Sequence, residues 1–215
     1  MKKRFSTLHH TQTPPKATPN TRTKRTIKPL TKAPSSPALI LFNKPFEVLC
    51  QFTDTDKNRL NLSKFIHYPH FYPAGRLDFD SEGLLLLTNS GSIQHQIQHP
   101  AQYTTKQYWA QVEGDLSESD LLPLSKGLLL RDGLTLPAIA ERILEPMIWP
   151  RNPPIRSRKN IPTSWVNIQM QEGKNRQVRR MLAHIGFPVL RLVRHQIGEW
   201  QLANLQPGEH QFIQL

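Results

Sequence analysis

An acidic segment that runs directly into four leucines constrains the fold of this chain more than any other feature. The segment lies between Gly75 and Gly83, and the leucine run 84–87 follows at once. Its charged residues are Arg76, Asp78, Asp80 and Glu82. Glycine permits backbone turns that other residues resist, and a short apolar run is typical of a buried strand. Because reactive side chains often lie on loops held by a rigid strand, the pattern predicts an acidic functional loop anchored by a buried strand.

The positive charge of the chain is unevenly distributed. The net charge is +12, and residues 1–36 hold nine Lys/Arg with no Asp or Glu, whereas the rest of the chain has 19 Lys/Arg against 16 Asp/Glu. A segment with so few large apolar residues cannot offset its ordering entropy, so we expect 1–36 to be a disordered tail. The tail serves either as a solubilising segment or, as we favour, as an arm that contacts phosphates. The charge favours a nucleic acid partner over an anionic membrane.

Composition excludes several classes of protein. The single cysteine, Cys50, excludes an internal disulfide. No apolar run approaches the roughly 20 residues of a membrane helix, and no apolar stretch follows the basic start as it would in a signal peptide. We therefore expect a soluble intracellular protein without membrane association, in which residues 37–215 form one domain.

Apolar patterning predicts an α+β fold with a mainly antiparallel sheet. The helix at 178–185 is the clearest, because Val178, Met181, Leu182 and Ile185 share one face. Pro123 is expected to shorten the helix at 117–126. Strands are expected at 38–42, 47–52, 84–87, 103–112, 134–144 and 164–170 and, as two or three short strands, within 189–215; further helices at 60–66 and 92–98; and a stiff basic loop at 146–162.

The 178–185 helix begins within a run of basic residues. Its members are Lys174, Arg176, Arg179 and Arg180, and Arg191 and Arg194 follow in the next expected strand. A charge run of this kind is usually a solvated face. Here no carboxylate after Glu172 balances the run, and Gly173 leaves the backbone open to a phosphate. The pattern predicts a polyanion-binding surface.

Four interpretations compete for the acidic loop. A polar turn is the default for an arbitrary acidic segment. A calcium loop fails because Asn89 stands where the pattern requires a bidentate acid. A metal-dependent nuclease lacks further acids near other strands, and His95 and His99 lack the remaining features of a zinc site. A single catalytic carboxylate among cationic RNA-binding groups fits the charge distribution best.

Three segments resemble the signature segments of RsuA-type pseudouridine synthases, in the same order. They are Gly-Arg-Leu-Asp at 75–78, Lys-Gln-Tyr at 106–108 and the run Gly-Lys-Asn-Arg-Gln-Val-Arg-Arg-Met at 173–181. The resemblance extends over residues 38–215. Many relatives carry a separate N-terminal S4-type RNA-binding domain, whereas this chain has only the basic tail there.

The resemblance implies the pseudouridine synthase catalytic fold, with two lobes around a basic cleft. It also implies isomerisation of a specific uridine in 23S ribosomal RNA to pseudouridine by an essential Asp78, with neither metal nor organic cofactor. Tyr108 would stack on the target base and accept a proton, and Arg179 would pair with Asp78. Asp80 and Glu82 would shape the loop. The implied RNA-binding residues are Arg76, Lys174, Arg176, Arg180 and Arg194.

The partner implied in this way is 23S ribosomal RNA, free or within a pre-50S particle, and the enzyme is expected to be a cytoplasmic monomer. Without the resemblance, the residues by themselves leave two other functions open. One is a non-catalytic ribosome-assembly protein that binds RNA through the same surface. The other is the metal-dependent nuclease described above.

Overall fold

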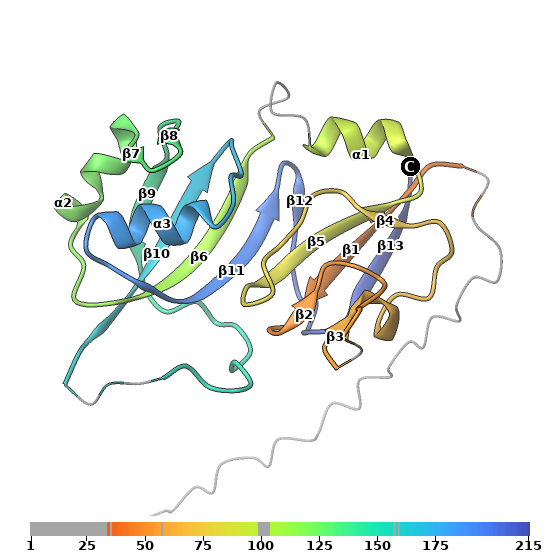
Figure 1. The fold of residues 1–215 in the computed structure, drawn as a ribbon, viewed down its shortest axis with the longest axis horizontal. Helices are drawn as coiled ribbons and strands as arrows, with labels where there is room; N and C mark the ends of the chain where they lie inside the picture. Colours follow the sequence, from red (N-terminus) through yellow and green to blue (C-terminus); the bar gives the residue numbers. More distant parts are fainter. Residues whose placement is uncertain (1–33, 35, 57, 99–103, 157, 159) are drawn as a thin grey trace, which may run out of the picture.

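A computed structural model describes residues 34, 36–56, 58–98, 104–156, 158 and 160–215. Its centre is a nine-stranded sheet with the order β13-β1-β5-β11-β6-β10-β9, in which β12 pairs with β11 and β4 with β5 (Figure 1). The sheet strands are β1 (Ala38–Lys44), β4 (Tyr72–Pro73), β5 (Glu82–Thr88), β6 (Lys106–Glu113), β9 (Ile139–Ile143), β10 (Thr163–Met170), β11 (Val189–Ile197), β12 (Trp200–Gln201) and β13 (His210–Gln214).

The remaining elements are short. Two small sheets pair β2 (Val48–Leu49) with β3 (Leu60–Asn61) and β7 (Leu129–Leu130) with β8 (Gly133–Leu134). The α-helices are α1 (Gly91–Gln98), α2 (Glu118–Leu121) and α3 (Gln177–His184), and 3-10 turns span Leu62–Lys64 and Leu122–Lys126. The described helices include none that is long and apolar enough to cross a membrane.

One short parallel contact joins the two halves of the large sheet. In this contact β5 and β11 run parallel, with Val193 opposite Glu82 and Arg194 opposite Gly83. All other neighbouring strands of the large sheet are antiparallel. Figure 1 shows β13, β1 and β5 on one side of this junction and β6, β10 and β9 on the other. The α+β class with a mainly antiparallel sheet is thereby confirmed.

Both faces of β1 and β5 are buried, which explains the uninterrupted apolar runs 38–42 and 84–87 within them. Leu85 and Leu87 pack on one face with Phe71, while Leu84 and Leu86 pack on the other. Successive side chains of a strand point to opposite faces, so a strand covered on both sides needs apolar residues at every position. The predicted buried strand after the acidic loop is confirmed.

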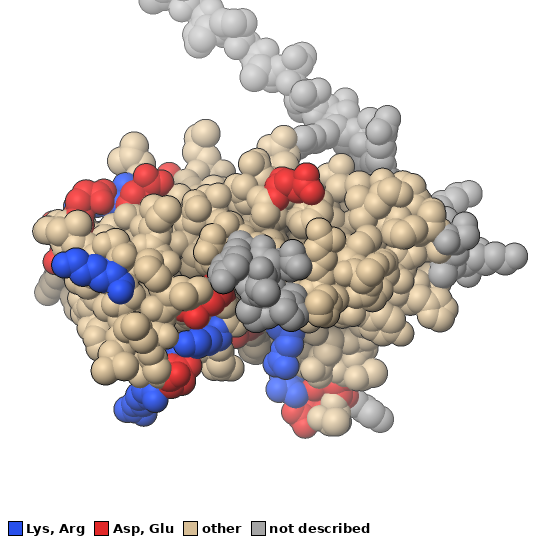
Figure 2. Space-filling view, turned by 90° about the horizontal axis from the view of Figure 1, so that it is seen from above, with Lys and Arg blue, Asp and Glu red and all other residues tan. Residues whose placement is uncertain are grey.

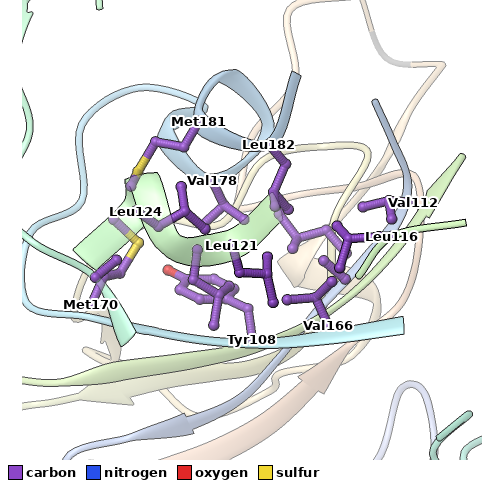
Figure 3. Packing of buried hydrophobic residues seen from close by; sticks show 14 of the residues in the cluster. Tyr108, Val112, Leu116, Leu121, Leu124, Val166, Met170, Val178, Met181 and Leu182 are labelled. Carbon is purple, nitrogen blue, oxygen red and sulfur yellow. The ribbon is translucent and has the colours of Figure 1, made fainter. Parts of the chain in front are cut away.

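The apolar face of α3 covers the other half of the sheet. Val178, Met181 and Leu182 are buried against Tyr108 and Val166 of β6 and β10 (Figure 3). The spacing argument placed these residues correctly, and the helix ends one residue before Ile185. This packing fixes the start of α3, which carries the basic run.

Several predicted elements are shorter than expected. The predicted 117–126 helix is four residues of α2 followed by a 3-10 turn that contains Pro123, which agrees with the expected shortening. The predicted strand 47–52 is only the two residues of β2. The predicted 134–144 strand is divided between β8 and β9, and the 60–66 helix is a two-residue strand and a 3-10 turn. The tail expected at 1–36 falls almost entirely on residues 1–33, outside the described residues.

Candidate active site

A cleft of about 600 Å³ lies beside the β5–β11 junction. Its wall comes from the loop before β5, the end of α1, the start of β6, the connection between β10 and α3, and β11. All three signature segments therefore meet at one place. The predicted site residues that line the cleft are Arg76, Asp78, Tyr108, Lys174, Arg176 and Arg194, and those that do not are Arg179 and Arg180.

The loop that carries Asp78 is held by its backbone. The Ser81 amide donates to the Asp78 carbonyl at 3.1 Å, which closes a tight turn, and the Glu47 amide donates to the Phe79 carbonyl at 2.9 Å. The Leu77 amide donates to the Cys50 sulfur at 3.3 Å, and the Leu77 side chain is buried. The loop is thus fixed on both sides of Asp78, whose side chain remains 31% exposed.

Lys44 supports the same loop from inside the protein. Its ammonium group is fully buried and donates to the carbonyls of Pro45, Val48 and Phe79 at 2.9, 2.8 and 3.4 Å. Burial lowers the pKa of Lys44 to about 8, against the raising effect of nearby negative groups. Sequence reasoning missed this residue, because a lysine at the end of an apolar strand is normally exposed.

The carboxylates of the loop have different partners. Arg176 donates to both oxygens of Asp80, at 2.7 and 2.9 Å, and lies 3.8 Å from the nearer oxygen of Asp78. Arg179 lies 3.5 Å from the Asp80 carboxylate and donates to the Asp80 carbonyl at 2.7 Å. The ion pair of Arg179 in this structure is therefore with Asp80 and not with the predicted partner Asp78, because its Nη2 reaches the Asp80 carbonyl and the Ser81 hydroxyl.

Glu82 points away from these two acids. Its buried carboxylate accepts hydrogen bonds from Arg191 Nε and Nη2 at 2.8 and 2.9 Å and from Trp149 Nε1 at 2.7 Å. Arg191 also donates to the Trp149 carbonyl at 2.9 Å. This network connects the 144–162 loop to the start of β5, so the assignment of Glu82 as a loop-shaping residue agrees with its contacts.

The basic run is more neutralised than its sequence indicated. Arg180 pairs with Asp132 of the β7–β8 turn at 2.5 Å, and Lys174 lies 3.7 Å from Glu172. In the space-filling view from above, the Lys and Arg side chains lie beside Asp and Glu side chains and do not form a continuous positive surface (Figure 2). No carboxylate after Glu172 takes part in these pairs, but Asp80 and Asp132, which lie far earlier in the chain, balance Arg176 and Arg180.

Arg194 lies beneath the cleft. It is 3% exposed, and it donates to the Leu84 carbonyl from Nε at 2.8 Å and to the Arg76 carbonyl from Nη1 at 3.3 Å. Its Nη2 is buried and has no partner among the described residues. Arg194 thus supports the backbone on both sides of Asp78, whereas Arg76 is exposed at the rim.

Tyr108 belongs to the cleft and to the hydrophobic core at once. It lies on β6 directly opposite Arg194 of β11 and is 7% exposed. Figure 3 shows the ring among Leu121, Val166 and Val178. The ordinary role of a strand tyrosine and a role in the cleft are therefore compatible, because the ring packs in the core and still borders the cavity.

The part of the chain that the structure describes contains no group of three His, Cys, Asp or Glu side chains placed to hold a metal ion. The three acids of the loop diverge, since Asp80 faces Arg176 and Glu82 faces Arg191. Of the two histidines considered above, His99 lies outside the described residues. Among the described residues, two partly exposed carboxylates line the cleft, Asp78 and Glu172. Glu172 accepts hydrogen bonds from the Leu136 amide and from Gln177, whereas the Asp78 carboxylate has only the 3.8 Å contact with Arg176.

Comparisons with known proteins agree with this geometry. Residues 38–184 match the model of the RNA pseudouridylate synthase family. The chain is 54% identical over 177 residues to the ribosomal large subunit pseudouridine synthase E of Vibrio parahaemolyticus, covering 82% of this chain and 74% of the relative. It is 51% identical over 173 residues to the protein of the same name from Xanthomonas campestris, covering 80% of this chain and 92% of the relative.

A solved pseudouridylate synthase structure has the same fold. It superimposes with a TM-score of 0.68 at 29% identity and covers 83% of this chain and 70% of the other. The resemblance noted in the three signature segments is confirmed by both the sequence relatives and the fold. The chain belongs to the RNA pseudouridylate synthase family and is an RNA pseudouridine synthase.

Proposed function

We propose that this enzyme converts one uridine of 23S ribosomal RNA to pseudouridine and that Asp78 is its catalytic carboxylate. The observation that carries the proposal is the position of Asp78, which is 31% exposed, in a cleft that Tyr108 also lines. The names of the relatives from Vibrio and Xanthomonas support the large-subunit substrate.

The reaction exchanges one bond at the sugar for another. The bond from N1 of uracil to C1′ breaks, the base turns, and a bond from C5 to C1′ forms, while the proton on C5 leaves and N1 gains one. Asp78 assists at the target nucleotide, and Tyr108, on the β6 wall, stacks on the base and accepts the C5 proton. All atoms of the nucleotide are retained, so the proposal requires neither a metal nor an organic cofactor.

The target base has to leave its stack to reach this cleft, which requires a few kcal/mol. Exposed Arg76 stands beside Asp78 at the rim, where it fills the gap left by the base. Lys174 and Arg176 line the cleft and contact phosphates. Arg180 contributes at the periphery once RNA competes with Asp132 for it. Arg194 acts on RNA through its charge and its support of the loop.

The proposal extends to the setting of the reaction. The enzyme works as a monomer in the cytoplasm on 23S ribosomal RNA, either free or within a pre-50S particle. The tail at 1–36, with nine Lys/Arg and no acid, adds phosphate contacts without reading sequence.

Mapping of modified uridines tests the proposal. Ribosomal RNA from cells that lack the enzyme is incubated, free and as pre-50S particles, with the wild-type protein or with Asp78→Asn, and pseudouridine is located by carbodiimide primer extension. With the wild-type protein we expect one new primer-extension stop in 23S RNA. The stop should also form in excess chelator, and the length of the RNA should not change. With Asp78→Asn we expect no new stop.

Three results would overturn parts of the proposal. Full activity of Asp78→Asn removes its catalytic role, provided that both proteins have the same thermal midpoint. Salt-sensitive RNA binding without any new stop identifies a non-catalytic assembly protein. Shortened RNA that a chelator protects identifies a nuclease.

A further inference from the structure

Lys106 is a half-buried cation in the wall of the cleft. It is the first residue of β6 and belongs to the second signature segment, two residues before Tyr108. Since side chains of a strand alternate between its faces, Lys106 and Tyr108 lie on the same side of β6, and both line the cleft. The Lys106 stem lies beside Gly173, where an added Cβ would be 3.9 Å from Lys106 Cε. Lys106 is thus held between the second and third signature segments.

No acid neutralises Lys106 within the part of the chain that the structure describes. Its ammonium group donates to the Thr104 carbonyl at 3.0 Å and takes part in none of the ion pairs among these residues. A lysine ammonium has three donors, so two of them have no partner there. By contrast, Arg176 of the same cleft pairs with Asp80 at 2.7 Å. Lys106 therefore keeps donors for a ligand.

Arg194 supplies another unsatisfied donor at the same cleft. It lies on β11 opposite Tyr108 of β6, and it is 3% exposed. Its Nε and Nη1 donate to backbone carbonyls, but its Nη2 is buried and has no partner among the described residues. Buried polar groups without a hydrogen bond are unfavourable and rare. A donor of this kind in a residue that lines a cleft indicates that a ligand oxygen completes it.

The charges of Lys106 and Arg194 act on one another. Burial lowers the pKa of the Lys106 ammonium, and the positive charge of Arg194 lowers it further. The charged form of Lys106 is therefore less stable here than in water. Negative charge on a bound group would offset both effects. This wall of the cleft accordingly favours a ligand that carries or develops negative charge.

The target base is the group that develops negative charge inside the cleft. When the bond from N1 to C1′ breaks, its electron pair stays on uracil and spreads over N1 and the carbonyl oxygens O2 and O4. The pair returns to the sugar when the bond from C5 to C1′ forms. Because the Arg194 donor is buried, a flat base that has left its stack reaches it more readily than a phosphate of the RNA backbone.

We propose that Lys106 is a further catalytic residue, which donates a hydrogen bond to a carbonyl oxygen of the target uracil and, with Nη2 of Arg194, stabilises the negative charge on the base. Donors that are already in place where charge develops are effective because they need no reorganisation during the reaction. The inference rests on the proposed isomerisation. It gives the second signature segment a cation beside the Tyr108 ring.

Lys106→Met removes the ammonium group and keeps an unbranched stem beside Gly173. We expect the single-turnover rate at saturating ribosomal RNA to fall at least about a hundredfold. RNA affinity should change by less than about threefold, with the same salt dependence, because a contact to the base releases no counterions. A phosphate contact would instead weaken binding and reduce the salt slope by about one. That result, with the rate at saturation unchanged, overturns the proposal.

Lys126→Met is the matched control. Lys126 is an exposed lysine at the end of the 3-10 turn 122–126, and it does not line the cleft. Its single-turnover rate and thermal midpoint should match those of wild type. The proposal is overturned if Lys106→Met also keeps the wild-type rate.

Lys106→Ala tests whether the ammonium group itself acts, because the truncated side chain leaves space for a small cation. Ethylammonium, which has three N–H donors, should raise the single-turnover rate of this variant at least about tenfold. Tetramethylammonium at the same ionic strength has no such donor and should leave the rate unchanged. Equal rates in the two salts overturn the proposal. Since this comparison uses one protein, it decides the question even where a substitution lowers the thermal midpoint.

Failure of the inference and failure of the proposed function give different results. If the wild-type protein forms no pseudouridine in 23S ribosomal RNA, the proposed function fails and the inference fails with it. Asp78→Asn is measured beside the lysine variants. If it is inactive while Lys106→Met keeps the wild-type rate, the function stands and only the inference is lost.

Discussion

The carboxylate of Glu82 and the guanidinium of Arg191 form a buried ion pair, with Nε 2.8 Å from Oε2. Both side chains are almost fully buried, and Trp149 completes the hydrogen bonding of the carboxylate. Glu82 is the first residue of β5, four residues after Asp78. The pair therefore attaches the acidic loop to β11 and to the 144–162 loop at the same time.

Glu82→Gln is expected to destabilise the protein strongly. The change leaves the Arg191 charge buried without a carboxylate partner, and loss of one partner of a buried pair typically lowers the free energy of unfolding by about 3–5 kcal/mol. Urea unfolding followed by tryptophan fluorescence measures it. Asp115→Asn, which breaks the exposed pair with Arg142, serves as control and should lower that free energy by less than about 1 kcal/mol. Equal losses in the two variants would contradict the prediction.

Gly83→Ala should disrupt the junction between the sheet halves. Gly83 has φ +104°, and an added Cβ would lie 2.3 Å from the Arg194 carbonyl oxygen. Since that atom is backbone, β5 and β11 have to separate, and the free energy of unfolding falls by more than about 1 kcal/mol. Gly91→Ala is the control, because it opens α1 with no atom within 4 Å. Thermal unfolding of both variants gives the comparison, and similar midpoints would show that the junction tolerates the side chain.

Two substitutions at Tyr108 should separate packing from chemistry. Tyr108→Ala removes a buried ring and should lower the free energy of unfolding by about 3–5 kcal/mol. Tyr108→Phe keeps the ring and should leave stability within about 1 kcal/mol of wild type, while single-turnover isomerisation slows by about a hundredfold for want of a proton acceptor. Isomerisation at the wild-type rate in Tyr108→Phe would limit this residue to stacking.

Stability should depend on pH through His195. Burial lowers the pKa of His195 from 6.5 to about 4, with the ring stacked on Trp109 at 4.2 Å between centroids. The unfolded chain gains the proton near pH 6.5 and the folded protein only near pH 4. The contribution of His195 to the free energy of unfolding is therefore complete above pH 6.5 and declines as the pH falls to 4. The decline is smaller than the roughly 3 kcal/mol of the full shift, because solvent reaches part of the ring.

Urea unfolding of wild type and His195→Gln between pH 7 and 4.5 checks this. The variant should lose less stability over that interval, whereas His184→Gln, at an exposed position of α3, should follow wild type. His210 remains in all three proteins, and burial and the charge of His67 lower its pKa as well. If the free energy of unfolding changes with pH equally in wild type and His195→Gln, the pH dependence comes from other groups.

The sequence predicted the position of the site more successfully than the ion pairs and hydrogen bonds within it. The strand at 84–87 and the apolar face of α3 follow from local patterning, and these elements place Asp78 and Arg176 at one cleft. The ion-pair partners do not follow from patterning, because Arg176 and Asp80 are 96 residues apart and Arg180 and Asp132 are 48 apart. Which of two arginines reaches a given acid depends on the angle at which α3 starts.

Buried charge was the other feature that patterning could not reveal. Lys44 ends an apolar strand, and Arg191 and Arg194 are interspersed among apolar residues in β11, so all three resemble ordinary surface cations in sequence. They are buried because carbonyls or a carboxylate from other segments satisfy them. Such contacts exist only after the sheet has formed.

The place of β11 in the sheet has a consequence for the order of folding. It stands between β5 and β6 at the centre, yet it comes from residues 189–197, after all three signature segments. During synthesis, a nascent chain that has reached His184 holds Asp78, Tyr108 and Arg176 but not the strand that joins its two halves. The cleft is therefore among the last parts of the protein to be completed, and a prematurely ended chain would carry all three signature segments without the complete cleft.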